Sequence, residues 1–131
     1  MKLLSKGSKL YSILFNKCPK CHIGSFWASN NPFKNMFFSN KNTCKTCENC
    51  SLAYELETGF WYGSMYVSYA ISVAVMVLFW TLTSFFFPLI NIYNEILIII
   101  IAILIVSPLN YHVSRLIWIN FFVKYIPNET Y

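Results

Sequence analysis

The hydrophobic positions of the chain are concentrated in its second half, in two long runs. The first run spans residues 63–87 and contains no charged residue. Because an α-helix rises about 1.5 Å per residue, about 20 apolar residues are enough to cross a hydrocarbon core about 30 Å thick. The run therefore predicts a transmembrane helix, with Trp61 and Tyr62 suited to the headgroup region at one end and Pro88 at the other.

The second run, residues 96–106, consists mostly of Ile and Leu and becomes long enough to cross a membrane when it is extended back to Leu89. Its β-branched residues are also typical of a strand, but an unpaired strand in lipid would leave its backbone groups without hydrogen-bond partners. We therefore expect a second transmembrane helix over 89–106. Together the two runs predict a membrane α-helical fold with a transmembrane hairpin over residues 60–107.

The residues after the second run predict a third helix. Ser107 and Pro108 form a pair typical of a helix start, with the serine as N-cap and the proline in the first turn. His112 and Arg115 follow three residues apart and favour anchoring at the membrane surface over binding of an anionic headgroup or a partner, but the polar residues here form no single stripe. We expect an interfacial helix and tail over 108–131. The alternative is that residues 109–124 continue the second span after a kink.

Composition and charge agree with a membrane protein. Of the residues, 56% are hydrophobic and 11% are charged, against about 25% charged in soluble proteins. The first 17 residues carry dispersed lysines and no signal-peptide core, which predicts a basic cytoplasmic segment over 1–17. The connection between the two apolar runs contains no Lys or Arg, so the positive-inside rule predicts that both termini are cytoplasmic.

The net charge of +5 suits a membrane surface better than nucleic acid, because the lysines are dispersed and form no dense basic run. We expect the lipid bilayer as the main partner, with other membrane proteins or a second copy of the chain as further candidates, and no nucleic acid. The sequence contains no recognisable nucleophile with its base, phosphate-binding glycine loop or open metal site. We therefore expect no enzymatic activity and identify no small-molecule substrate.

The cysteines carry the most specific chemical signal, and they lie in a polar head over residues 18–59. Cys18 and Cys21 form one CxxC pair, and Cys47 and Cys50 form a second pair about 25 residues later. Two such pairs are typical of a zinc ribbon, in which each tight turn directs two thiolates at one tetrahedral ion. Cys44 could replace Cys50 as the partner of Cys47, and it is the alternative ligand.

The residues around each pair also matter for this prediction. We favour Cys47 with Cys50 because a strand-like alternation over residues 51–57 follows directly and leads towards the membrane. Gly24 suits a left-handed residue that closes the first turn. Ser51 occupies the comparable early position after the second pair and is less suited to it.

Other chemistry is compatible with the same cysteines. Iron could take the place of zinc with the same four ligands. Residues 18–22 also fit CxxCH, the attachment motif of c-type haem with His22 as axial ligand, but this would leave the second pair without a role. Disulfides suit an oxidising compartment rather than the cytoplasm, and a redox dithiol lacks a thioredoxin-like βαβ context.

The chain resembles the DUF983 family of small bacterial membrane proteins, on three stretches: NKCPKCHIGSFW at 16–27, CENCSLAYELETGFWYGSMYVSYA at 47–70 and SPLNYHVSRLIWINFFVKY at 107–125. The pattern is similar to the Bacteroidetes branch of the family. The resemblance implies a cysteine-pair head with two transmembrane helices in the bacterial inner membrane. It places the family's cysteines at Cys18, Cys21, Cys47 and Cys50, with serine at 51 where the family usually has glycine, and it does not include Cys44.

From these features we expect an integral membrane protein with a structural zinc-binding head that binds or assembles other membrane proteins. The alternative is a thiol redox or metal-delivery factor for an envelope or respiratory enzyme. A closed four-thiolate site favours the structural role, whereas an exchangeable site that uses Cys44 would favour delivery.

Overall fold

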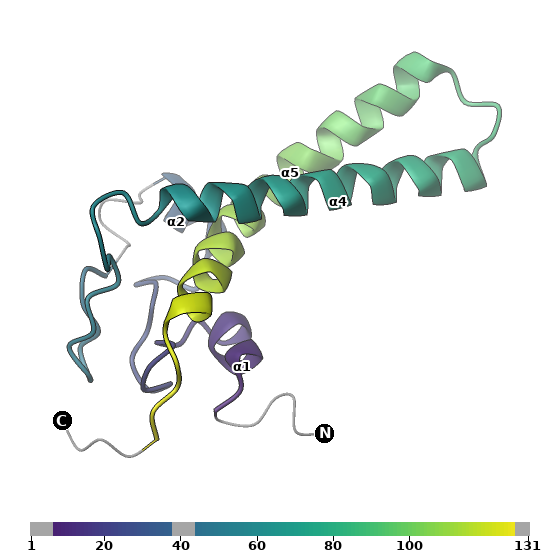
Figure 1. Cartoon of the computed structure of the whole chain (residues 1–131). Helices are drawn as coiled ribbons and strands as arrows, with labels where there is room; N and C mark the ends of the chain where they lie inside the picture. Colours follow the sequence, from purple (N-terminus) through teal and green to yellow (C-terminus); the bar gives the residue numbers. More distant parts are fainter. Residues whose placement is uncertain (1–6, 38–43, 128–131) are drawn as a thin grey trace.

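The computed structural model describes residues 7–37 and 44–127, and its regular structure in these ranges is helical (Figure 1). Isolated antiparallel bridges also join Lys17 with Ser25 and Thr46 with Ala53. The strand-like alternation over residues 51–57 therefore forms no strand. The helices are α1 (Lys9–Leu14), α2 (Pro32–Phe37), α4 (Tyr62–Phe86) and α5 (Ile92–Phe122).

The helices α4 and α5 form a hairpin that projects from a smaller head (Figure 1). Both helices are long and apolar enough to cross a membrane, as the two apolar runs predict. The helix α4 ends at Phe86, and its C-cap Phe87 lies directly before Pro88. The side chain of Asn91 caps the start of α5 by accepting a hydrogen bond from the Tyr93 backbone N–H. The turn between the helices lies at the end of the molecule far from the head.

Polar side chains connect the two long helices at two levels. Near the head, the Asn110 side-chain amide donates to the Ser68 carbonyl at 3.0 Å and to the Ser72 hydroxyl at 2.9 Å. Near the turn, the Thr83 hydroxyl donates to the Glu95 carboxylate at 3.0 Å. Such contacts are typical of helix pairs in lipid, where apolar surfaces alone give little preference for protein over lipid.

The prediction that a new helix begins at Ser107 and Pro108 is wrong, because α5 runs through both residues without interruption. Proline removes the backbone N–H that would bond the Leu104 carbonyl one turn earlier. The Ser107 hydroxyl donates to that carbonyl instead, at 2.9 Å. The Ser107 hydroxyl therefore satisfies the carbonyl that the proline leaves without its usual donor, and no new helix starts here. The helix α5 bends along its length, as a proline-containing helix does (Figure 1).

The segment predicted as an interfacial helix forms part of the head. In the C-terminal half of α5, the buried His112 and Asn120 contact residues from the N-terminal region. The Asn35 side-chain amide lies 2.9 Å from His112 Nδ1, and the Asn120 amide lies 3.1 Å from the Ser12 hydroxyl. The polar residues of this half form no surface stripe because their partners are protein groups far away in the sequence.

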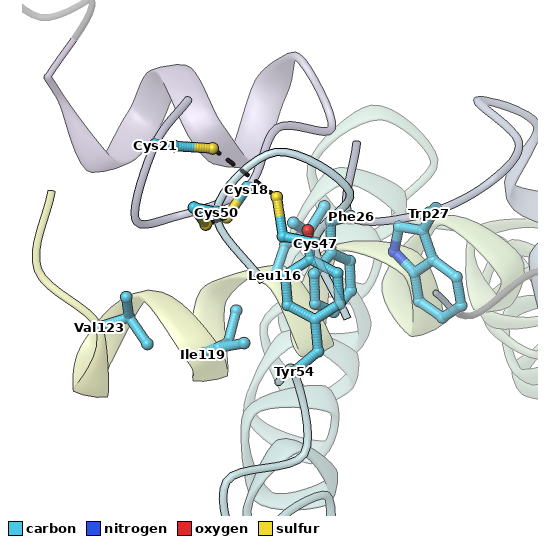
Figure 2. Close-up of a cluster of buried hydrophobic side chains, with 10 residues drawn as sticks. All are labelled: Cys18, Cys21, Phe26, Trp27, Cys47, Cys50, Tyr54, Leu116, Ile119 and Val123. Atoms are coloured by element: carbon cyan, nitrogen blue, oxygen red, sulfur yellow. Dashed lines mark hydrogen bonds between the residues drawn. The ribbon is translucent and has the colours of Figure 1, made fainter. Parts of the chain in front are cut away.

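The core of the head combines the cysteine loops with this half of α5 (Figure 2). Trp27 is fully buried, and its indole N–H donates to the His112 carbonyl at 3.3 Å. The boundary predicted between a head over 18–59 and a tail over 108–131 therefore separates residues that share one core. The buried members of this core are Cys18, Cys21, Phe26, Trp27, Cys47, Cys50, Tyr54, Leu116, Ile119 and Val123.

Candidate metal centre

The two cysteine pairs fold into turns with matching hydrogen bonds. In the first turn, the His22 N–H donates to the Cys18 carbonyl at 3.0 Å, and the Cys18 N–H donates to the Gly24 carbonyl at 2.8 Å. In the second, the Ser51 N–H donates to the Cys47 carbonyl at 3.0 Å, and the Cys47 N–H donates to a backbone carbonyl at 2.9 Å. Each turn thereby orders the backbone around its own two thiols.

Each turn closes on a residue in the left-handed region directly after its second cysteine. These residues are His22, with φ of 55°, and Ser51, with φ of 52°. The prediction that Gly24 supplies the left-handed residue of the first turn is wrong, because Gly24 is not among the residues with positive φ. The space beside Gly24 is occupied by the Cys47 thiol instead, so this glycine is required for close approach of the two turns.

The structure brings together the four predicted cysteines. The Sγ atoms of Cys18, Cys21, Cys47 and Cys50 all lie within 4.8 Å of one another, and all four residues are buried. The Cys18–Cys50 and Cys21–Cys47 sulfur pairs are each 3.7 Å apart. Four sulfurs bound tetrahedrally to zinc at about 2.3 Å would be about 3.8 Å apart.

The same distances correspond to free thiols rather than disulfides. All five cysteines are free, and the sulfur separations of 3.7 Å are far longer than the roughly 2.05 Å of a disulfide bond. Four buried thiols at this spacing form a soft, compact donor set that could hold one metal ion. Zinc and iron both accept such ligands.

Cys44 lies outside this group of four. Its side chain is half-buried and packs against the edge of the core. Burial raises the pKa of its thiol, and the nearby charges of Glu48 and Cys47 raise it further. Its sulfur is not among the four that lie within 4.8 Å of one another, so Cys44 is not a member of this candidate ligand set.

The surroundings of the clustered cysteines shift their thiol pKa values in different directions. Burial raises the pKa of Cys18. Burial also acts on Cys47, but the backbone N–H groups of Cys50 and Asn49 outweigh it and lower the pKa of Cys47 to about 7. The buried Tyr54 hydroxyl, which donates to the Ser25 carbonyl at 3.0 Å, lies beside both thiols. Donors directed at sulfur stabilise the thiolate form that a metal requires.

Apolar side chains from α5 cover the cluster. Leu116 and Ile119 are fully buried in the core that contains the four thiols, and Val123 completes that cover. The chain after α5 is also tied to the first turn, because the Ile126 N–H donates to the Lys20 carbonyl at 3.0 Å. The cysteine cluster is thus joined directly to the end of a helix long enough to cross a membrane.

The two residues predicted to anchor the chain at a membrane surface, His112 and Arg115, lie among aromatic rings. His112 is buried and stacks on Trp27 with ring centroids 5.4 Å apart. The Arg115 guanidinium lies over the rings of Tyr111 and Trp61, at 4.6 and 5.0 Å from their centroids. The sequence identified both residues as functional candidates but gave no signal that Trp27 and Trp61, which come from distant segments, lie beside them.

The sequence profile of the family described as "Protein of unknown function (DUF983)" matches residues 37–122, which is more than half of the 131-residue chain. The matched stretch includes Cys47, Cys50 and both long helices, whereas Cys18 and Cys21 precede it. No curated protein and no solved structure matches the chain.

Proposed function

Because the chain belongs to the DUF983 family, whose function is unknown, we propose a role for it from its geometry. The protein is a membrane-anchored zinc module of the bacterial inner membrane, and it binds or assembles other membrane proteins. Its helices α4 and α5 cross the bilayer, and both termini are cytoplasmic. Cys18, Cys21, Cys47 and Cys50 hold one structural zinc ion, and the chain catalyses no reaction.

The observation that carries this proposal is the burial of four convergent thiols in one core with Leu116 and Ile119 of α5. The head has two helices of six residues each and two isolated bridges within its described part, so its regular structure is sparse. A structural zinc ion contributes about 10–16 kcal/mol of binding free energy, which becomes folding free energy when the site exists only in the folded chain. The metal would thus fix the head to the end of α5.

The surface of the long helices supports the membrane placement. Within the most apolar window of each helix, 6% of α4 and 11% of α5 is buried inside the protein. A helix that is apolar on all sides and uncovered by protein is expected in lipid. The exposed large side chains include Phe85 at 81%, Leu104 at 65% and Ile105 at 66%.

Apolar side chains exposed on the head support a binding role. Leu14, Phe15 and Ile23 lie outside both long helices and are 65%, 53% and 66% exposed. Exposed apolar groups that gather on a small domain often mark an interaction surface. A membrane protein partner, or a second copy of this chain, would cover them.

The rival role, thiol redox or metal delivery, is disfavoured by the same geometry. Redox exchange and metal transfer both need a ligand that a partner can reach, and all four clustered cysteines are buried. Cys44 is more accessible, but its sulfur lies outside the cluster of four that could hold the metal. Replacement of Cys44 by serine should therefore leave metal content unchanged.

The cysteine variants test the structural role against delivery. We expect Cys47→Ser to lose the metal and the thermal unfolding transition of the head, while Cys44→Ser retains both. The measurement is metal content by mass spectrometry together with thermal unfolding in mild detergent. Loss of metal from Cys44→Ser, or rapid transfer of zinc from the wild type to a chelator of moderate affinity, would support delivery instead.

A crosslinking experiment tests the binding role. A photo-crosslinking residue placed at Ile23 should form a discrete adduct with another membrane protein or a second copy of the chain. The matched control is the same probe at Lys124, an exposed polar position just after α5. Adducts with lipid alone at Ile23, in membranes from the native host, would contradict an assembly role for this surface.

A further inference from the structure

A groove of about 980 Å³ opens between the start of α4, the preceding segment and the C-terminal half of α5. Its wall is largely apolar and aromatic, with Trp61 just before α4, Met65 and Tyr69 in α4, and Tyr111 in α5. Two charged residues line it, Glu55 and Arg115. An apolar cleft that contains one cation and one anion can distinguish ligands by the placement of their charges.

Arg115 is held in place by aromatic rings rather than by an acidic partner. Its guanidinium lies 4.6 Å from the centroid of Tyr111, 5.0 Å from that of Trp61 and 5.7 Å from that of Trp27. Among the described residues, it has no hydrogen bond or ion pair. Glu55 attracts it through space but does not contact it. The fork of N–H donors on Arg115 is therefore available to a ligand.

The groove has the length of one acyl chain. Along α4 it follows Trp61, Met65, Ser68 and Ser72, which lie on one face of the helix. At about 1.5 Å per residue this face is about 16 Å long, close to half of a hydrocarbon core about 30 Å thick. The serine side chains are small, and space remains beside them for a flexible chain.

We propose that the groove binds a phospholipid with a primary amine in its headgroup, a phosphatidylethanolamine. Its phosphate pairs with the Arg115 guanidinium, its ammonium group pairs with the Glu55 carboxylate, and one acyl chain lies along α4. This inference rests on the membrane placement proposed above. The aromatic residues at the start of α4 then lie at headgroup level, where Trp and Tyr are enriched.

The pair of opposite charges favours this headgroup over other common ones. Arginine binds phosphate through two parallel hydrogen bonds, which a point charge cannot provide. A carboxylate accepts hydrogen bonds from a primary ammonium, whereas the trimethylammonium of phosphatidylcholine has no N–H to donate. Phosphatidylglycerol would leave Glu55 beside the phosphate without a cation.

Native mass spectrometry of the full chain tests the proposal, with the protein purified from membranes and its metal content confirmed. The probes are phosphatidylethanolamine, phosphatidylglycerol and phosphatidylcholine with identical acyl chains. We expect preferential binding of phosphatidylethanolamine, weakened about tenfold or more by Arg115→Gln. Arg115→Lys should weaken this binding as well, because lysine retains the positive charge but lacks the paired N–H donors of the guanidinium. Lys124→Gln, which removes a positive charge outside the groove, should bind as the wild type does.

Glu55 provides a second and independent variant. Glu55 is exposed, so Glu55→Gln should fold normally, lose the preference for phosphatidylethanolamine and bind phosphatidylglycerol at least as well as the wild type does. Glu57→Gln is the matched control outside the groove. Equal binding of the three lipids by the wild type, or an unchanged preference in both Arg115→Gln and Glu55→Gln, would overturn the groove assignment alone. Failure to recover the protein from membranes would overturn the proposed function and this inference with it.

Discussion

Gly24 and the thiol of Cys47 meet so closely that a β carbon on Gly24 would lie 2.5 Å from the Cys47 Sγ. The two residues belong to different cysteine turns and are 23 positions apart in the sequence. Because a β carbon and a sulfur do not approach to this distance, any side chain at position 24 must push the two turns apart. The absence of a side chain at Gly24 thus allows the four sulfurs to converge.

Gly24→Ala should destabilise the head by about 1–3 kcal/mol, the cost typical of overpacking a well-filled core. It should also weaken metal retention, because Cys47 can no longer hold its position. The measurement is thermal unfolding together with metal content after dialysis against a chelator. The control is Ser25→Ala at the next position, where the side chain is exposed. Equal stability and metal retention in the two variants would contradict the contact.

Ser51→Gly should stabilise the protein by about 1 kcal/mol, because a left-handed conformation is costly for residues with a β carbon. Ser51 has φ of 52° and closes the second cysteine turn. The control is Ser25→Gly, at a position without positive φ, where glycine should destabilise instead. Chemical denaturation of the metal-loaded protein measures both effects, and a loss of stability in Ser51→Gly would show that the serine side chain matters more than the backbone.

The contact between Gly63 and Trp118 gives a third prediction. The Trp118 ring lies directly on the backbone of Gly63 in the first turn of α4, and its indole N–H donates to the Phe60 carbonyl at 2.9 Å. Gly63→Ala should therefore separate α4 from α5 and cost about 1–3 kcal/mol. The double variant with Trp118→Leu should recover part of that loss. Additive losses in the double variant would contradict a direct clash.

His22 should make the head sensitive to acid. Burial lowers the pKa of His22 below its usual 6.5, and its Nδ1 accepts a hydrogen bond from the Gly7 N–H at 3.2 Å. In the window below pH 6.5 the unfolded chain therefore binds more protons than the folded chain, so stability falls as the pH falls.

Unfolding experiments between about pH 5.5 and 7.5, with metal content checked at each pH, measure this effect. The control is His22→Asn, because asparagine tolerates the left-handed backbone at position 22 and does not titrate. It should remove most of the pH dependence. The same slope in both proteins would contradict the assignment to His22.

Local sequence patterns were sufficient for the long helices and for the choice of cysteines. The two apolar runs correspond to α4 and α5, and the pairing of Cys47 with Cys50 rather than Cys44 agrees with the cluster in the structure. Helix length in lipid and the CxxC turn are both set by residues close together in the chain. Such features can be recognised without knowledge of the rest of the fold.

The features that sequence analysis misassigned depend on distant contacts. Ser107 and Pro108 are typical of a helix start, but here the Ser107 hydroxyl donates to the Leu104 carbonyl in place of the N–H that the proline lacks. The buried polar residues in the half of α5 that follows, His112 and Asn120, bond to residues 77 and 108 positions away, and no local pattern shows these contacts. Gly24 was assigned a backbone role because the thiol beside it comes from the other turn.

The central claim is that the four cysteines hold one structural zinc ion. The most direct test is to purify the full chain in mild detergent and to measure bound metal by mass spectrometry together with visible absorbance. We predict about one zinc per chain, in line with a closed four-thiolate site, and no visible absorbance. An iron or haem spectrum, or a chain that carries no metal and contains disulfides, would contradict the claim.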